Sequence, residues 1–234
     1  MKLEPGNLSL LEALFKERLN RFLVRVDQGG HARLAHLPNP GRLLELLRPG
    51  APVLLQGRPG RHRKTGYDLA AVRRGDVWVS VDTRLPNRAA RAWLTAGVLP
   101  EFRGYSAIRP EVVLRESRLD FLLQNGRDCY LEVKSCTLIE NRVAFFPDAP
   151  TARGTRHVET LAYAVGQGFR GCILFVVQRP DARWFRPRDE TDPIFGKALR
   201  EAQAKGVEVI AYRTMFDGAT LVDPQHIQTD LRPY

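Results

Sequence analysis

The chain has 234 residues, 44% of them hydrophobic, which is enough for one large globular domain or two modest ones. Its 36 Lys and Arg residues exceed its 26 Asp and Glu residues, and the resulting formal net charge of +10 favours a polyanionic partner, nucleic acid first. No apolar run approaches the roughly 20 residues of a membrane span, and the first residues lack a signal peptide's apolar core, so we expect a cytoplasmic protein with no membrane partner.

Short strand-like runs, separated by glycine and proline, fill the first half of the chain. Residues 8–15 carry apolar side chains at helical spacing and predict a short helix. Residues 42–47 predict a second small helix. Strands are predicted at residues 22–26, 32–37, 53–56, 68–72 and 77–81. Short strands at this spacing fit a small β-barrel of the OB type, to which we assign residues 1–81.

The densest basic segment of the chain lies between two of these strands, at residues 58–66. A loop rich in Arg and Lys on a small barrel can follow the phosphates of a nucleic acid strand. A solvated loop without a partner would have the same composition, so the residues alone leave both interpretations open. The candidate phosphate contacts in this loop are Arg58, Arg61, Arg63 and Lys64.

The second half, residues 82–234, alternates helices and strands. The order of elements predicts an α/β (α+β) domain with a central mixed sheet. Residues 178–192 are expected to form an irregular loop, and the tail after Phe216 carries no clear pattern. The expected helices lie at residues 86–96, 151–169 and 193–205, and the expected strands at 112–114, 119–123, 130–133, 143–146, 172–177 and 207–212.

A hairpin is predicted where Asn125-Gly126 separates two of these strands. A two-residue turn would pair Asp120 with Leu131. A three-residue loop with a glycine bulge, residues 125–127, pairs Gln124 with Asp128 and Asp120 with Glu132 instead. Because side chains alternate along a strand, the second register is the one that brings the two carboxylates together.

Two carboxylates facing each other across a ladder repel unless a cation lies between them. Oxygen ligands suit Mg²⁺ or Mn²⁺, so Asp120 and Glu132 are candidate metal ligands. Lys134 lies on the same face as Glu132 and could orient a water or stabilise developing charge. The pattern resembles the PD-(D/E)xK nuclease signature, although an ordinary exposed face with a cross-strand Asp–Lys pair would look the same.

The helix predicted at residues 151–169 carries basic side chains in its first turns, where free backbone N–H groups already favour a phosphate. Arg153, Arg156 and His157 are therefore candidate nucleic-acid contacts. His157 could equally be a structural histidine. Asp192, directly before Pro193, is the expected cap of the following helix.

Several separate motifs together resemble the sugar fermentation stimulation protein A family, over roughly residues 19–212. The resemblance implies an N-terminal OB-like domain and a C-terminal domain of the PD-(D/E)xK nuclease type, with DNA binding and a proposed nuclease activity. The motifs are Arg21-Phe-Leu-Val, Pro38-Asn-Pro-Gly-Arg42, Glu45-Leu-Leu-x-Pro-Gly50, Arg63-Lys-Thr-x-Tyr-Asp-Leu69, Val81-Asp-Thr83, Pro86-Asn87, Ser117-Arg-x-Asp-Phe121, Tyr130-x-Glu-Val-Lys-Ser135, and Phe146-Pro-Asp-Ala-x-Thr-x-Arg-Gly154 with His157.

The sequence departs from the family pattern at three places. Leu37 and Pro40 stand where the family often has Cys and Thr. The helix at residues 86–96 has no Glu, although related nucleases often use a carboxylate there. Glu111 or Glu116 would have to substitute as the third metal ligand, and we expect Glu116, with a solvent-facing acid as the alternative.

Two functions follow from this pattern. The first is a nuclease that depends on Mg²⁺ or Mn²⁺ and binds DNA, or RNA, through the barrel and the basic helix end. The second is a DNA-binding regulator of sugar metabolism that retains a nuclease-like fold without turnover. The sequence leaves open the strandedness, the sequence specificity, the physiological pathway and the oligomeric state, including a homodimer.

Overall fold

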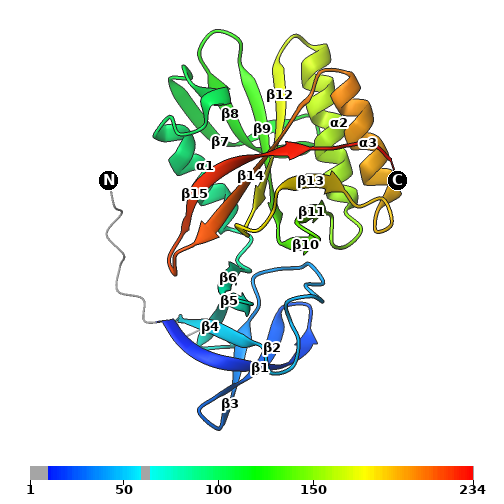
Figure 1. Cartoon of the computed structure of the whole chain (residues 1–234). Helices are drawn as coiled ribbons and strands as arrows, with labels where there is room; N and C mark the ends of the chain where they lie inside the picture. The colour runs from blue at the N-terminus through cyan, green and yellow to red at the C-terminus, as the bar shows by residue number, and fades with distance from the viewer. Residues whose placement is uncertain (1–9, 59–63, 234) are drawn as a thin grey trace. The chain divides into compact units, whose positions relative to one another are not determined.

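The computed structural model describes residues 10–58 and 64–233, which belong to two compact units (Figure 1). One, called the barrel unit, comprises Met1–Leu85 and Met215–Val222. The other, called the sheet unit, comprises Pro86–Thr214 and Asp223–Tyr234. The chain therefore passes between the two units three times.

The strands of the barrel unit lie in the order β3-β2-β1-β4-β5-β6. Neighbours run antiparallel, and a parallel pairing of β3 with β5 closes the first five strands of this order into a barrel. Val24 and Val26 point into the barrel while Arg25 between them is exposed, as expected for a strand with one buried face. The predicted OB-like barrel is confirmed. The strands of the barrel unit are β1 Leu10–Asn20, β2 Leu23–Gln28, β3 His31–His36, β4 Pro52–Gly57, β5 Tyr67–Arg74 and, outside the closed ring, β6 Val77–Ser80.

The helix predicted at residues 8–15 is wrong over its described part, because these residues begin strand β1. Ala13 and Phe15 are buried while Leu14 between them is exposed, so burial alternates with a period of two. β1 pairs with β2 on one side and β4 on the other, and these ladders override a weak helical pattern.

The small helix predicted at residues 42–47 is also wrong. Leu43 has a φ of 52°, a left-handed conformation that interrupts a right-handed helix. The amides of Leu46 and Leu47 donate to the Leu43 carbonyl at 3.1 and 2.9 Å and close one turn. Leu43 and Leu46 still reach the barrel core, so the apolar pattern there reflects burial rather than a helix.

The sheet unit contains one mixed sheet of nine strands in the order β10-β11-β13-β15-β14-β12-β9-β8-β7. β9, β12 and β14 run parallel, whereas β7, β8 and β9 are antiparallel. The strands are β7 Ala107–Leu114, β8 Ser117–Gln124, β9 Cys129–Cys136, β10 Leu138–Glu140, β11 Val143–Phe146, β12 Arg170–Val177, β13 Trp184–Pro187, β14 Glu208–Phe216 and β15 Leu221–Thr229.

Helices complete this unit, and α2 and α3 pack side by side against the sheet (Figure 1). Val158 and Leu161 of α2 and Leu199 of α3 share one core with Phe175 of β12. Almost all of β12 is buried, which explains its continuous apolar sequence. The helices are α1 Leu85–Thr95, the 3-10 turn Pro100–Phe102, α2 Ala152–Gly166 and α3 Pro193–Ala204.

Three strands of the sheet were not predicted. One is β10, Leu138–Glu140, a short strand that pairs with β11. The other two are β13 and β15. β13 lies within residues 178–192, expected to be an irregular loop, and β15 lies in the tail after Phe216. Both are short or polar, and β15 contains Pro224 and a left-handed Asp223 with a φ of 52°. Their pairing partners, rather than their own residue pattern, make them strands.

Membrane spanning by a helix is not supported by the structure. Within residues 10–58 and 64–233, no helix is both long enough and apolar enough to cross a bilayer.

Candidate active site at the β8–β9 hairpin

The β8–β9 hairpin has the register that the three-residue loop predicted. Phe121 pairs with Leu131, so the next position along the ladder sets Asp120 opposite Glu132. Gly126 has a φ of 79°, which a glycine adopts without strain. Gln124 Nε2 donates to Asp128 Oδ2 at 3.0 Å and closes the base of the loop.

Asp120 lies where β8 and β9 separate. The β8–β9 ladder ends at Phe121 and Leu131, and the backbone N–H of Val133 donates to Asp120 Oδ2 at 2.8 Å instead of to a strand carbonyl. Asn87, in the first turn of α1, donates its Nδ2 to Asp120 Oδ1 at 2.5 Å. The carboxylate is thus held by one strand and one helix.

Glu132 lies on β9, in the interior of the sheet, and is only 2% exposed. Its Oε1 accepts hydrogen bonds from Lys134 Nζ, at 2.5 Å, and from His157 Nδ1. Its Oε2 is buried and has no hydrogen-bond partner among the described residues. A buried carboxylate oxygen without a donor is costly, so this atom is the place where a cation would contribute most.

His157 is 4% exposed and lies between Glu132 and Arg153. Arg153 Nε donates to His157 Nε2 at 3.2 Å. Because a guanidinium only donates, Nε2 must accept, and the proton of the neutral ring is on Nδ1, toward Glu132. The expectation that His157 contacts a phosphate is therefore wrong: its ring is buried and both nitrogens are occupied.

The two carboxylates have opposite pKa shifts. Burial, together with the nearby charge of Glu132, raises the pKa of Asp120 to about 6. Burial also opposes ionisation of Glu132, but the hydrogen bond from His157 and the charge of Lys134 outweigh it and lower the pKa of that carboxyl. One ionised carboxylate thus lies beside one that holds its proton more tightly, an arrangement frequent at functional sites.

The donor set fits a hard divalent cation. Among the described residues no cluster contains three or more His, Cys, Asp or Glu side chains, so the site offers two carboxylates. Mg²⁺ is commonly held by one or two carboxylates and keeps several waters. A cation here would satisfy Glu132 Oε2 and relieve the repulsion that raises the pKa of Asp120.

Glu116, expected as a third metal ligand, is not brought to this pair. It occupies the two-residue turn between β7 and β8 and is exposed, four residues along the chain from Asp120. Glu111, the other candidate, is also exposed, and its carboxylate lies 3.7 Å from Arg118. Both acids face solvent, Glu116 in the turn and Glu111 within β7, so the metal-ligand role expected for Glu116 is wrong.

Asn87 is the residue that the sequence prediction missed. The first helix has no Glu, but a polar residue, Asn87, stands at its start directly after Pro86, and this was the signal in the sequence. Gln178 was missed as well. It is fully buried directly after β12, and its Nε2 donates to Ser135 Oγ at 2.8 Å. In the sequence, Gln178 could have been noticed as a polar residue that directly follows an apolar run.

The expected basic contacts lie in both units. In the sheet unit, Arg153 and Arg156 are exposed in the first turns of α2, and Arg153 reaches the site through His157. In the barrel unit, Lys64 is exposed, and Arg58 Nε lies 3.3 Å from the buried carboxylate of Asp68. Arg61 and Arg63 lie outside the described residues. Arg58 thus has a structural partner, and its phosphate contact stays a prediction.

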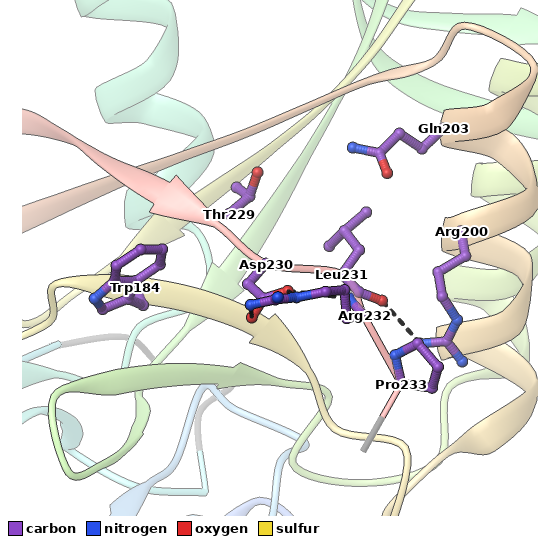
Figure 2. A pocket seen from close by; sticks show the side chains of 8 residues that line it. All are labelled: Trp184, Arg200, Gln203, Thr229, Asp230, Leu231, Arg232 and Pro233. Carbon is purple, nitrogen blue, oxygen red and sulfur yellow. Dashed lines mark hydrogen bonds and ion pairs between the residues drawn. The ribbon is translucent and has the colours of Figure 1, made fainter.

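A hollow of about 580 Å³ lies elsewhere in the sheet unit, lined by residues of β13, α3, the end of β15 and the segment after it (Figure 2). Figure 2 shows Arg200 of α3 directed at the Leu231 carbonyl, to which it donates at 3.4 Å. Arg232 is hydrogen-bonded to Asp230 and lowers the pKa of that carboxyl to about 2. Because Arg200 is likewise paired, with Asp189, the hollow is a structural ion-pair region rather than the candidate active site.

The fold and the site define a class of protein: an OB-type barrel joined to an α+β unit whose mixed sheet carries a buried Asp–Glu–Lys set. The chain belongs to the sugar fermentation stimulation protein (SfsA) family. The family model "Sugar fermentation stimulation protein RE domain" matches residues 84–220, and "SfsA N-terminal OB domain" matches residues 17–81. This confirms the resemblance inferred from the motifs.

Relatives match almost the whole chain. A "Sugar fermentation stimulation protein homolog" of Moorella thermoacetica is 47% identical over 221 residues, covering 93% of this chain and 94% of that protein. The homolog of Chloroflexus aurantiacus is 46% identical and covers 91% of this chain and 83% of its own length. A solved structure, Pyrococcus furiosus SfsA in complex with Ca²⁺, is 30% identical with a TM-score of 0.88 and covers 98% of both chains.

Proposed function

We propose that this protein is a nuclease that depends on a divalent cation and hydrolyses phosphodiester bonds in DNA, with RNA as a second substrate class. The observation that carries the proposal is the opposed Asp120 and Glu132 pair with an unpartnered, buried Glu132 Oε2. A protein that only binds nucleic acid has no need of two carboxylates in this arrangement.

Asp120 and Glu132 are the residues that would hold Mg²⁺ or Mn²⁺. When bound, such an ion supplies Lewis-acid stabilisation of the negative charge that builds up on the phosphate. The Pyrococcus furiosus relative was solved in complex with Ca²⁺, a cation that also prefers oxygen ligands. That complex supports a hard cation as the ligand of this family without giving its position in this chain.

The chain's own residues have distinct roles in this proposal. Asn87 and the Val133 amide fix the orientation of the Asp120 carboxylate. His157 holds Glu132 Oε1 and leaves Oε2 free. Lys134, whose side chain is mostly buried, stabilises charge on the phosphate or orients the attacking water. In the reaction the water oxygen joins phosphorus, one ester P–O bond breaks, and the water proton passes to the leaving oxygen.

Nucleic acid as the substrate is supported by charge. The formal net charge is +10, and Arg153 and Arg156 are exposed in the first turns of α2, the end of a helix that favours an anion. Arg153 links this surface to Glu132 through His157. A phosphate bound at this helix end would lie near the carboxylate pair.

The test measures cleavage and metal binding in the same variants. Single- and double-stranded DNA and RNA are incubated with wild type, Asp120→Asn and Lys134→Ala, in Mg²⁺, in Mn²⁺ and in EDTA. We expect Asp120→Asn to abolish cleavage and cation binding measured by calorimetry, because one of two ligands is lost. Lys134→Ala should cleave about 10²-fold more slowly but still bind the cation. Both should retain nucleic-acid affinity.

Asp128→Asn is the matched control, since it changes the same chemical group at the other end of the same hairpin. It should cleave like wild type. Equal cleavage by wild type and Asp120→Asn would mean a contaminating nuclease and would overturn the proposal. Tight DNA binding by wild type with no metal-dependent cleavage of any substrate would establish the non-catalytic regulator instead.

A further inference from the structure

The barrel unit exposes an aromatic ring at its β1–β2 turn. Phe22 is 45% exposed, unusual for a phenylalanine that could have been buried in the barrel core. His36, at the end of β3, stacks on it with ring centroids 6.1 Å apart and an interplanar angle of 27°. The guanidinium of Arg21 lies 5.4 Å from the Phe22 ring centroid. Two flat groups thus lie beside one exposed ring.

The turn that carries Phe22 is held firmly. Asn20 Oδ1 accepts the Phe22 amide at 2.9 Å, and the Phe22 carbonyl accepts the Leu37 amide at 2.9 Å. The guanidinium of Arg18 donates to the carbonyls of Arg21 and Gly41, each at 2.7 Å. The ring is therefore displayed by a fixed backbone, and a ligand that stacks on it loses little backbone entropy.

The ring lies at one end of the outer face of β2 and β3. On that face Leu23 pairs with His36, and Arg25 pairs with Leu34, which is 43% exposed. In OB barrels, this face and the loops between strands 1 and 2 and between strands 4 and 5 are where oligonucleotides bind. In this barrel the β1–β2 turn carries Arg21 and Phe22, and the described ends of the β4–β5 connection carry Arg58 and Lys64.

The charge of this region fits a polyanion. Between residues 20 and 42 there is one acid, Asp27, and its carboxylate is paired with Lys16 at 3.1 Å. The same stretch has four arginines: Arg21, Arg25, Arg33 and Arg42, all exposed. An exposed aromatic ring beside arginines is the combination that binds unpaired bases by stacking and the backbone by charge.

We propose that Phe22, with Arg21 and His36, forms a stacking platform for unpaired bases of a single-stranded nucleic acid. The base stacks on the exposed ring or on the outer plane of the Arg21 guanidinium. Duplex nucleic acid does not use the platform, because its bases are already stacked within the helix. The proposal shares only the class of substrate with the proposed nuclease and uses none of its catalytic residues.

The experiment is fluorescence anisotropy in EDTA, so that cleavage plays no part. The probes are a labelled oligodeoxythymidylate and an oligouridylate of about 15 nucleotides, within the site size of an OB fold, and a blunt duplex of the same length. Phe22→Ala should weaken binding of the single strands about 5- to 100-fold without changing duplex binding. Its salt dependence should stay unchanged, since no phosphate contact is lost. Arg21→Ala should lower the slope of log affinity against log salt by about 0.7.

Matched variants separate stacking from general surface effects. Phe22→Tyr keeps the aromatic face and should bind like wild type, whereas Phe22→Leu keeps an apolar group and should bind like Phe22→Ala. Leu14→Ala removes a side chain of nearly equal exposure, 44%, in the middle of β1 and away from the β1–β2 turn, and should have no effect. Thermal unfolding checks that each variant is folded.

Wild-type affinity of Phe22→Ala for both single strands, or equal losses for single strand and duplex, would overturn the platform. Wild-type affinity of Phe22→Leu would also overturn the platform, because it would show that an apolar contact suffices and that no aromatic stacking is needed. A loss confined to the DNA or to the RNA probe would support the platform and identify its ligand. Because no cation is present, absence of nuclease activity would not affect any of these outcomes.

Discussion

Two carboxylates of similar chemistry behave differently at this site because their neighbours differ. Asp120 has an amide and a backbone N–H as partners, and these do not offset its burial beside Glu132. Glu132 is more deeply buried but has Lys134 and His157 on one oxygen. Burial alone would have raised the pKa of both groups, so the direction of each shift depends on the donors that packing supplies.

Asp120→Asn is expected to stabilise the cation-free protein at neutral pH. The pKa of about 6 in the folded protein exceeds the ordinary value of 3.8 for an aspartate, so folding favours the protonated carboxyl. That contribution is fully present below pH 3.8 and is lost as pH rises through about 6. The neutral amide of Asn does not ionise and does not undergo this loss. Above pH 7 the free energy of unfolding of the variant should therefore exceed that of wild type by up to about 3 kcal/mol.

Urea unfolding in EDTA, from about pH 4 to about pH 8, measures this difference between variant and wild type. The excess free energy of unfolding of Asp120→Asn over wild type should rise with pH and level off above the pKa of Asp120. Addition of Mg²⁺ should stabilise wild type and leave the variant unchanged. If the difference in unfolding free energy did not change with pH, ionisation of Asp120 would not destabilise the folded protein.

At the scale of elements, one buried carboxylate fixes the starts of two helices. Asp192 Oδ1 accepts the Phe195 amide at 3.0 Å and caps α3, as its place before Pro193 predicted. Its Oδ2 also accepts the Thr151 amide at 2.7 Å, and Thr151 in turn caps α2 by accepting the Gly154 amide. The first turns of α2, which carry Arg153 and His157, are thereby tied to α3.

Asp192→Ala should lower the free energy of unfolding by about 2–3 kcal/mol, because a cap is lost and a partly buried N–H is left without an acceptor. Urea denaturation gives the value. Asp217→Ala is the control: Asp217 also accepts two backbone amides, from Ala219 and Thr220, but in an exposed turn, and its loss should cost less than 1 kcal/mol, roughly. An equal loss of unfolding free energy in the two variants would mean that Asp192 acts only as an ordinary turn residue.

At the scale of the whole molecule, the last part of the chain completes the sheet. β15 lies between β13 and β14, so the strands β10-β11-β13 join the rest of the sheet through it. Ile227 and Leu231 are 5% and 7% exposed and belong to the core between sheet and helices. Residues 215–222 belong to the barrel unit, so the same segment serves both units.

A chain truncated after Phe216 should therefore fail to unfold cooperatively, as followed by circular dichroism and limited proteolysis. The point variant Ile227→Ala should cost about 2–4 kcal/mol, since it removes buried methyl groups and leaves a cavity. Gln228→Ala, at the exposed neighbouring position, should change stability by less than 0.5 kcal/mol, about the usual range for surface sites. Native-like melting of the truncated chain would show that β15 is dispensable.

The sequence by itself determined the features that depend on local alternation and turns. The strands β2 to β6, helices α1 to α3 and the pairing of Asp120 with Glu132 all followed from periodicity and loop length, because a strand alternates its faces every residue. The sequence motifs, taken together, were sufficient to identify the family.

The tertiary structure decided what depends on contacts distant in sequence. Pairing with β2 and β4 made residues 10–15 a strand, and the neighbours β13 and β14 made β15 one. Packing of α1 and α2 brought Asn87 to Asp120 and turned His157 inward to Glu132, while Glu116 stayed in an exposed turn. Burial and the positions of hydrogen-bond donors determine which carboxylate of the site is ionised. Neither can be predicted from residue spacing, because both depend on residues tens of positions apart in the sequence.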